Sequence, residues 1–76
     1  MENRIRNVMA AVFGISVEDI NEESSPDSID NWDSLNLMNL VVSLEEEFDI
    51  EFDDSDIVEM LNFKLIVSII QEKLSN

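Results

Sequence analysis

Hydrophobic residues recur along most of this chain at the three- and four-residue spacing of amphipathic helices. The first segment carries such a set over residues 2–13, and Gly14 follows it directly, where a helix C-cap commonly falls. The members of the set are Ile5, Val8, Met9, Val12 and Phe13. The spacing therefore predicts a helix over residues 2–13.

The next segment, residues 15–33, has no sustained period and contains Pro26 together with several serine, asparagine and aspartate residues. We predict a long loop with a short turn of helix around residues 17–20. A loop of this length in a small domain is usually functional or held by buried anchors. The candidate anchors are Ile15, Val17, Ile20, Ile29 and Trp32.

Residues 34–48 predict a second helix, with Asp33 as its N-cap. At about 100° per residue, its hydrophobic side chains fall on two nearly opposite faces. One face has Leu37, Leu40, Val41, Leu44 and Phe48, and the other has Leu35, Met38 and Val42. A helix in a small bundle rarely buries both faces. The second face is therefore either covered by the preceding loop or exposed as a contact surface.

Two further helices are predicted after a polar segment in which Ile50 and Phe52 alternate inward. The short third helix is capped by Asp53, Asp54 or Ser55 and carries Ile57, Val58, Met60 and Leu61; the last is capped by Asn62 and carries Phe63, Ile66, Val67, Ile70 and Leu74. We therefore expect an all-α fold, a four-helix bundle with three main helices and a short third helix. Residues 1–76 are expected to form one domain.

The composition narrows the class of protein. A hydrophobic fraction of 45% indicates a packed core despite a net charge of -14. Eighteen acidic against four basic residues argue against nucleic acid and favour basic protein surfaces as partners. Apolar runs such as residues 65–70, which Ser68 interrupts, are too short to insert into a membrane. The absence of cysteine and of a signal-peptide stretch is compatible with the cytoplasm.

Ser34 at the predicted helix start is the main candidate for chemistry. A catalytic serine needs a base, usually histidine and sometimes lysine. The chain has no histidine, and Lys64 and Lys73 lie in the last predicted helix, so we expect no enzyme. A helix N-terminus does favour a phosphate group, which makes Ser34 a plausible attachment point. The alternative is an ordinary helix start, where serine and aspartate are common.

The acidic runs do not predict a metal site. A calcium-binding EF-hand loop that began at Asp49 would need glycine at its sixth position and glutamate at its twelfth. The chain has Asp54 and Met60 there. We expect no dedicated metal site.

Several of these residues together resemble the acyl carrier proteins, and the resemblance covers nearly the whole chain. The residues are Asp33-Ser34-Leu35, Leu40, Leu44-Glu45-Glu46-Glu47-Phe48-Asp49 and Ile50-Glu51-Phe52. The resemblance implies that a separate phosphopantetheinyl transferase esterifies Ser34 with 4'-phosphopantetheine, with Asp33 and Leu35 beside it. The thiol of that cofactor then carries an acyl group as a thioester. It also implies that the chain has no catalytic activity of its own.

The resemblance further implies that the serine-led helix is the surface that partner enzymes recognise. The expected partners are acyl-transferring or condensing enzymes with basic docking surfaces. The residues expected on the partner surface are Leu35, Met38, Val42, Glu45 and Glu46. Acyl chains can be held inside bundles of this family, and the residues expected to line such a space are Leu37, Val41, Met60 and Ile66.

The chain departs from carriers of fatty-acid synthesis at several positions. Asn36 and Asn39 stand where those carriers usually have acidic residues, and Leu37 replaces a small polar residue. Trp32 looks more like stand-alone carriers of specialised pathways, including aminoacyl and D-alanyl carriers. We expect a monomeric acyl carrier of fatty-acid, polyketide or related lipid biosynthesis. The alternatives are an aminoacyl or peptidyl carrier and an unmodified acidic adaptor.

The excess of acidic residues predicts a stability that depends on salt. Like charges repel one another in the compact state, and ions screen that repulsion. We expect added sodium chloride or a divalent cation to raise the Tm, measured by circular dichroism across a salt titration. A Tm that stays constant or falls as salt is added would contradict this expectation.

Overall fold

The computed structural model describes residues 1–75, which form four α-helices and a short 3-10 helix, η1, with no β-strand. In chain order the elements are α1 (Glu2–Phe13), η1 (Val17–Asp19), α2 (Ser34–Phe48), α3 (Asp54–Val58) and α4 (Phe63–Leu74). The predicted all-α bundle with a short third helix is therefore confirmed.

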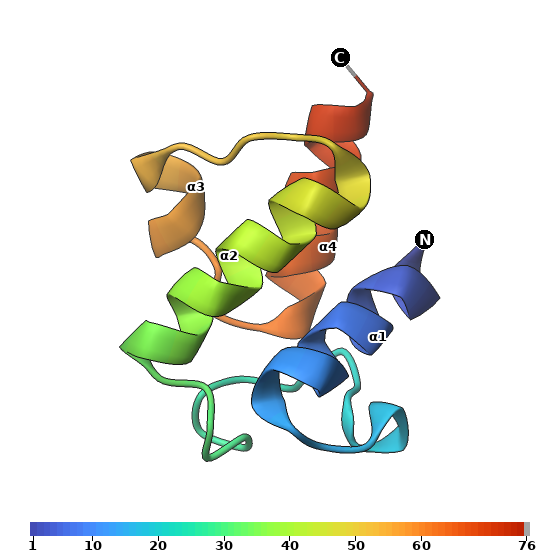
Figure 1. Cartoon of the computed structure of the whole chain (residues 1–76), viewed down its shortest axis with the longest axis vertical. Helices are drawn as coiled ribbons and strands as arrows, with labels where there is room; N and C mark the ends of the chain where they lie inside the picture. Colours follow the sequence, from blue (N-terminus) through green and yellow to red (C-terminus); the bar gives the residue numbers. More distant parts are fainter. Residues whose placement is uncertain (76) are drawn as a thin grey trace.

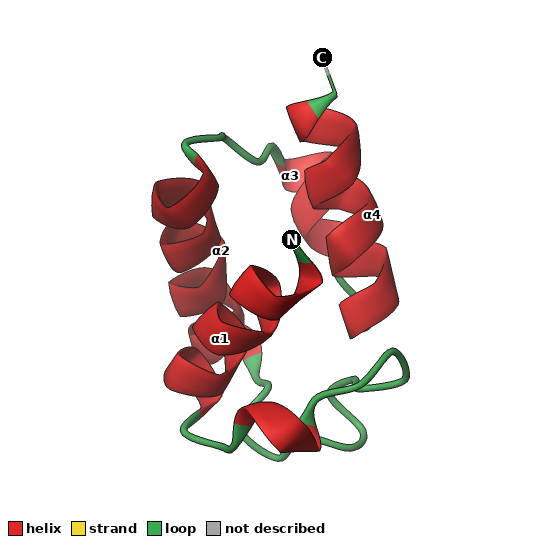
Figure 2. Cartoon of the chain, turned by 90° about the vertical axis from the view of Figure 1, so that its right-hand side faces the viewer, coloured by secondary structure: helices red, strands yellow, loops and turns green. Residues whose placement is uncertain are grey.

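The helices surround a hydrophobic core to which α1, α2 and α4 contribute most of the buried side chains. The short helix α3 lies on the side of the bundle opposite α1 (Figure 1). The long loop between α1 and α2 gathers at the end of the bundle where α2 begins (Figure 2). None of the helices within residues 1–75 has the length and apolar character needed to cross a membrane.

The starts of α2 and α4 are capped by side chains that the sequence predicted for this role. Asp33 Oδ1 accepts the Asn36 N–H at 2.8 Å, and Asn62 Oδ1 accepts the Leu65 N–H at 2.8 Å. These bonds satisfy N–H groups that have no partner within the helix. The predicted N-cap roles of Asp33 and Asn62 are confirmed.

The acidic residues at the start of α3 form a reciprocal capping box. Asp53 Oδ1 accepts the Asp56 N–H at 3.0 Å, and Asp56 Oδ2 accepts the Asp53 N–H at 3.1 Å. The hydroxyl of Ser55 and the backbone N–H of Asp56 both donate to the Asp53 carboxylate and hold its pKa below the ordinary value. Of the three candidate caps, Asp53 is the one that the helix uses.

Two helices end in a left-handed residue. Gly14 follows α1 with φ 68° and donates its N–H to the Ala10 carbonyl. Asp49 follows α2 with φ 54° and ψ 51° and donates its N–H to the Glu45 carbonyl. Glycine adopts this conformation freely, whereas a residue with a Cβ atom does so at a cost. The end of α2 is therefore strained and the end of α1 is not.

The loop anchors are partly as predicted. Ile20, Ile29 and Trp32 are buried, and Ile15 is half-buried against the core. The prediction for Val17 was wrong, because this side chain is 38% exposed. It belongs to η1, a single turn at the surface, and the chain turns inward only at Ile20, which follows that turn.

The hydrophobic sets of the last two helices also need correction. Because α3 ends at Val58, Met60 and Leu61 follow the helix instead of belonging to it. Met60 is buried, whereas Val58 and Leu61 are exposed. Leu74, in the last turn of α4, is also exposed. Ile69 is buried, although the predicted core set of that helix did not include it.

Three of the four basic side chains join different elements. Arg4 of α1 lies 4.4 Å from the centre of the Phe48 ring and pairs with Glu47 at 2.9 Å. Lys73 of α4 pairs with Asp56 of α3 at 2.7 Å. Arg6 of α1 likewise lies 5.0 Å from the ring centre of the first residue of α4. Each contact places a cation over an aromatic ring or beside a carboxylate.

The strained end of α2 predicts a stabilising substitution. Asp49→Gly relieves the left-handed backbone and removes a negative charge from the negative end of the helix dipole. We expect the free energy of unfolding to rise by about 1 kcal/mol, measured as a higher urea midpoint with an unchanged m value. The matched control is Glu51→Gly, which removes the same charge from a residue without a positive φ. Equal effects of the two substitutions would contradict the explanation.

Candidate functional site

Ser34 is the first residue of α2 and its side chain is exposed. The extended backbone of Asp33, with φ -114° and ψ -178°, leads the chain from the loop into the helix. The first turn of a helix presents free N–H groups and the positive end of the helix dipole. The hydroxyl is therefore accessible at a place that favours a negatively charged group.

The residue before this turn is held firmly in the core. Trp32 is 5% exposed, and its ring stacks on that of Phe13 with the centroids 5.3 Å apart. Its backbone N–H also donates to the Ile29 carbonyl at 3.1 Å. Trp32 is buried and Ser34, two residues later, is exposed. The buried Trp32 therefore determines where Ser34 reaches the surface.

Asp33 has a structural role in this turn. Besides the side-chain cap, its carbonyl oxygen accepts the Leu37 N–H at 2.8 Å, the first bond of the helical ladder. Both bonds belong to the helix-capping role that the sequence predicted for Asp33. Ser34 does not cap the helix, because Asp33 occupies that position.

A largely hydrophobic groove of about 470 Å³ opens beside Ser34, between the start of α2 and α3. Its lining consists of Pro26, Trp32, Asp33, Ser34, Leu37, Ile57, Val58, Met60 and Leu61. We call it the serine groove. It contains Leu37 and Met60 from the predicted acyl-lining set. The other two members, Val41 and Ile66, are buried in the core and do not border it.

The sequence reasoning missed several residues of the serine groove, including Trp32 and Ile57 in this role. One signal was available in the residues around α3. Val58 and Leu61 are large hydrophobic residues in a segment too short to bury all of them, and they are 70% and 61% exposed. Exposed hydrophobic residues that gather beside an exposed serine at a helix start indicate a contact surface.

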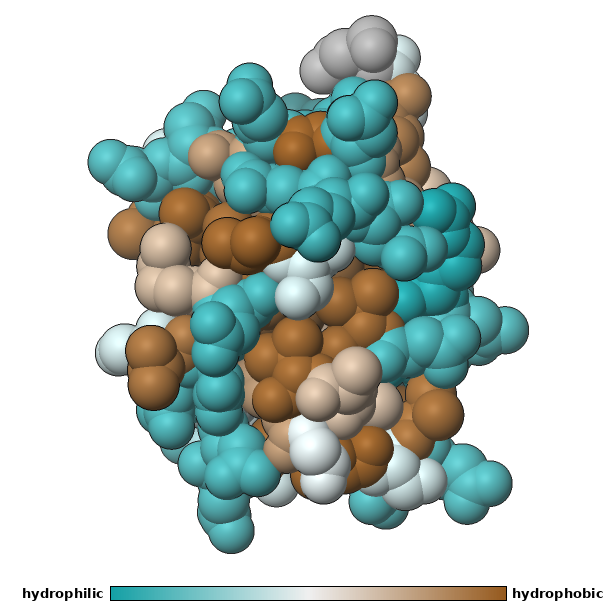
Figure 3. Space-filling view, viewed as in Figure 1, coloured by the Kyte–Doolittle hydropathy of each residue, from teal (hydrophilic) through white to brown (hydrophobic). Residues whose placement is uncertain are grey.

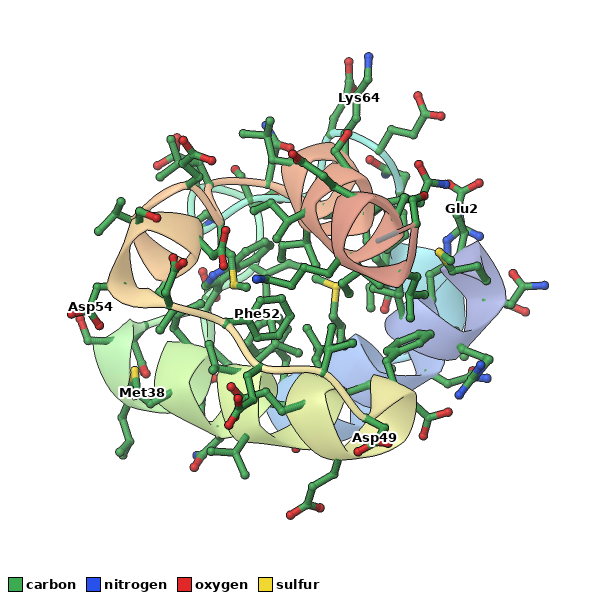
Figure 4. The ribbon with its side chains drawn as sticks, turned by 90° about the horizontal axis from the view of Figure 1, so that it is seen from above. Glu2, Met38, Asp49, Phe52, Asp54 and Lys64 are labelled. Carbon is green, nitrogen blue, oxygen red and sulfur yellow. The ribbon has the colours of Figure 1, made fainter. Side chains whose placement is uncertain are left out.

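The second hydrophobic face of α2 is not covered by the loop. Leu35, Met38 and Val42, which we call the exposed stripe, are 74%, 49% and 51% exposed. Hydrophobic side chains reach the surface over α2 and α3 between hydrophilic ones (Figure 3). Figure 4 shows Met38 on α2 at the periphery of the bundle, whereas Phe52 lies toward its middle.

The two acidic residues expected beside the exposed stripe differ in their surroundings. Glu46 is exposed, and it lies four residues beyond Val42 on the same side of α2. Glu45 is half-buried, and its Oε2 accepts the Phe52 N–H at 2.9 Å. Glu45 therefore fastens the segment between α2 and α3 to the end of α2, and Glu46 is the freer of the two charges.

Among the described residues 1–75, neither lysine side chain hydrogen-bonds to Ser34, as a base that activates a serine would. The hydrogen bond from Lys73 to Asp56 raises the pKa of Lys73, so that amine stays protonated and cannot accept a proton. Lys64 lies on the outer side of α4 (Figure 4). Residues 1–75 contain no cluster of three acidic, histidine or cysteine side chains that would hold a metal ion.

Comparison with known proteins agrees with this geometry. A family model described as the phosphopantetheine attachment site matches residues 3–70. An acyl carrier protein of Nitratidesulfovibrio vulgaris (strain DSM 19637 / Miyazaki F) is 33% identical over 96% of this chain and 96% of its own length. An acyl carrier protein of Chlamydia muridarum is 32% identical over 96% of this chain and 95% of its own length.

The fold agrees with a solved structure as well. The solution structure of the holo acyl carrier protein from Geobacter metallireducens superposes with a TM-score of 0.87 at 30% sequence identity. The match covers 97% of this chain and 85% of that protein.

Proposed function

The chain belongs to the acyl carrier protein family, whose members carry phosphopantetheine, and on this basis we propose that Ser34 is its attachment residue. The modified protein would carry acyl groups as thioesters and deliver them to partner enzymes. The observation that carries the proposal is the exposed Ser34, which begins α2 two residues after the buried Trp32.

The residues around Ser34 fit a phosphopantetheine arm. The N–H groups of the first turn of α2 favour its phosphate, and Asp33 is occupied with capping this turn. When bound, the cofactor supplies the thiol that this chain lacks, since it contains no cysteine. Leu37 and Met60 in the serine groove would contact the arm or a short acyl chain.

A longer acyl chain would need space inside the bundle. We propose that Val41 and Ile66, which are buried, are the residues such a chain would meet on entering the core. Both are hydrophobic, and an acyl chain that packs against them is removed from water.

We propose that the exposed stripe and the acids beside it form the docking surface for partner enzymes. Leu35 begins the stripe directly after Ser34, so an enzyme seated there also meets whatever Ser34 carries. A hydrophobic patch with an acidic edge, made by the exposed Glu46 and the half-buried Glu45, fits a basic surface that surrounds an apolar pocket. The net charge of -14 would speed encounters with such enzymes.

The composition and charge of the chain support a monomeric, cytoplasmic carrier without catalytic activity of its own. A chain without histidine or cysteine, whose Lys73 stays protonated, suits a carrier that leaves catalysis to its partners. Strong like charge opposes self-association, which supports a monomer formed by one carrier domain. The absence of cysteine is compatible with a cytoplasmic protein.

The neutral residues beside Ser34 bear on the pathway. Asn36 and Asn39 leave the start of α2 less acidic than the rest of the surface. The candidate pathways are fatty-acid, polyketide and related lipid biosynthesis, with aminoacyl or peptidyl chemistry as the alternative. The neutral Asn36 and Asn39 favour a pathway other than primary fatty-acid synthesis. An unmodified acidic adaptor is the competing function, because the exposed stripe by itself suits protein binding.

The attachment at Ser34 is tested by intact mass spectrometry. We expect incubation with coenzyme A and a phosphopantetheinyl transferase to add the mass of one 4'-phosphopantetheine to the wild-type chain. Ser34→Ala should abolish the gain, and Ser68→Ala, which alters another exposed helical serine, should retain it. No gain in the wild type, or a gain that persists in Ser34→Ala, would favour the unmodified adaptor.

The docking surface is tested by Met38→Glu. Because Met38 is 49% exposed, we expect the substitution to change the free energy of unfolding by less than about 0.5 kcal/mol. Affinity for the transferase should fall by about tenfold, because a charge replaces an apolar contact. Val17→Glu adds the same charge to a similarly exposed side chain away from the stripe and is the matched control. Equal affinities of the two variants would contradict the docking surface, and a severe loss of stability would show that Met38 belongs to the core.

A further inference from the structure

Asparagine side chains connect the start of α2 to the end of α1. Asn39 Nδ2 donates to Asn36 Oδ1 at 3.3 Å, and Asn36 Nδ2 donates to the Asn31 carbonyl at 2.7 Å. Asn31 Nδ2 in turn donates to the Phe13 carbonyl at 2.7 Å. We call Asn31 and Asn36, whose amides donate to backbone carbonyls, the amide relay. The exposed Asn39 contacts the relay only through the longer bond to Asn36 and is not part of it. The relay spans the loop and ends on the last residue of α1.

The direction of the relay is set by its acceptors. The carbonyl oxygens of Asn31 and Phe13 accept hydrogen bonds and cannot donate them. Asn36 and Asn31 must therefore each present an NH2 group to a backbone oxygen. A carboxylate at either position has no proton to donate. The chain thus needs an amide where an acidic residue of similar shape would fit.

The hydrogen bonds of the relay hold the residues on both sides of Ser34. The Asn31 carbonyl accepts a second hydrogen bond, from the Asp33 backbone N–H at 3.0 Å. The two bonds fasten Asp33 and Asn36 to the same oxygen, with Ser34 between them in the sequence. The buried Trp32 ring holds this segment from the inside, and the relay holds it from the outside.

An uncharged side chain at position 36 is unexpected unless its hydrogen bond to the Asn31 carbonyl is needed. Asn36 is the third residue of α2, where the helix dipole favours an acidic side chain. In a chain with eighteen acidic residues, an amide at this position gives up that favourable interaction. The hydrogen bond to the Asn31 carbonyl is the interaction that an acid would lose.

We propose that Asn36, acting through Asn31, is a positioning residue for the modification of Ser34. The inference rests on the proposed function, since it concerns the residue that receives phosphopantetheine. By tying the start of α2 to the loop, the relay limits the positions that the Ser34 hydroxyl adopts when a transferase approaches. A nucleophile that is held in place reacts faster than one that must first be ordered.

The test compares Asn36→Asp with Asn39→Asp. Both add one negative charge near the start of α2, but only Asn36→Asp removes a donor to a backbone carbonyl. We expect kcat/KM for phosphopantetheine transfer from coenzyme A to fall about fivefold to tenfold in Asn36→Asp, the factor of one lost hydrogen bond. Asn39→Asp should stay within about twofold of the wild type. Added acidity by itself would speed the encounter with a basic transferase.

Two further measurements separate positioning from simple loss of stability. Asn36→Ala removes the donor without adding charge, and it should lose the same factor as Asn36→Asp. Hydrogen exchange should become faster at the hydrogen-bonded Asp33 and Leu37 amides in both variants, at a temperature where circular dichroism shows them fully folded. Asn31→Asp removes the hydrogen bond from Asn31 to the Phe13 carbonyl. If either Asn36 variant does not fold, Asn31→Asp is measured in its place.

The outcomes distinguish this inference from the proposed function. If the wild-type chain is not modified, the proposed function is wrong and the inference falls with it. If the wild type is modified and Asn36→Asp and Asn36→Ala react at its rate, the inference alone is overturned. It is also overturned if Asn36→Asp and Asn39→Asp lose activity equally, because the loss would then not depend on the hydrogen bond that Asn36 donates to a backbone carbonyl.

Discussion

The packing of Trp32 against Phe13 is the interaction on which the presentation of Ser34 depends. A loop of this length has many ways to approach α2, and its conformational entropy opposes any single one. Burying a large aromatic ring two residues before the serine offsets part of that cost. The chain therefore leaves the core at a defined point, and Ser34 is the first helical residue outside it.

The distribution of charge follows from the small number of cations. Arg4, Arg6 and Lys73 lie between elements of the bundle, over rings or beside carboxylates, where they oppose the repulsion of the surrounding acids. The surface that remains is strongly acidic. Some acids are occupied as helix caps, as in the box of Asp53 and Asp56, and others are free to attract a basic partner. A shortage of cations thus shapes both the stability of the bundle and the kind of protein it meets.

Ser34 lies at the boundary between two hydrophobic surfaces with different geometry. On one side it borders the serine groove, which is hollow and partly enclosed by α3. On the other it precedes Leu35, the first member of the exposed stripe along α2. A group attached to the hydroxyl can rest in the groove or turn outward toward a protein on the stripe. Sheltering a cargo and handing it over are therefore both compatible with one attachment point.

The helices, the caps of α2 and α4 and the position of Ser34 at a helix start could be predicted from the sequence because they depend on local interactions. Hydrophobic spacing and capping residues such as Asp33 act within a few residues of one another. The exposure of Leu35, the half-burial of Glu45 and the serine groove depend on where the loop and α3 pack, which is not local. The wrong prediction for Val17 and the omission of Ile69 have the same cause. The spacing of hydrophobic residues shows which side chains share a face of a helix, but it does not show which face another element covers. The sequence by itself determined where α1, α2 and α4 begin, and the tertiary structure alone decided which hydrophobic side chains remained in contact with water.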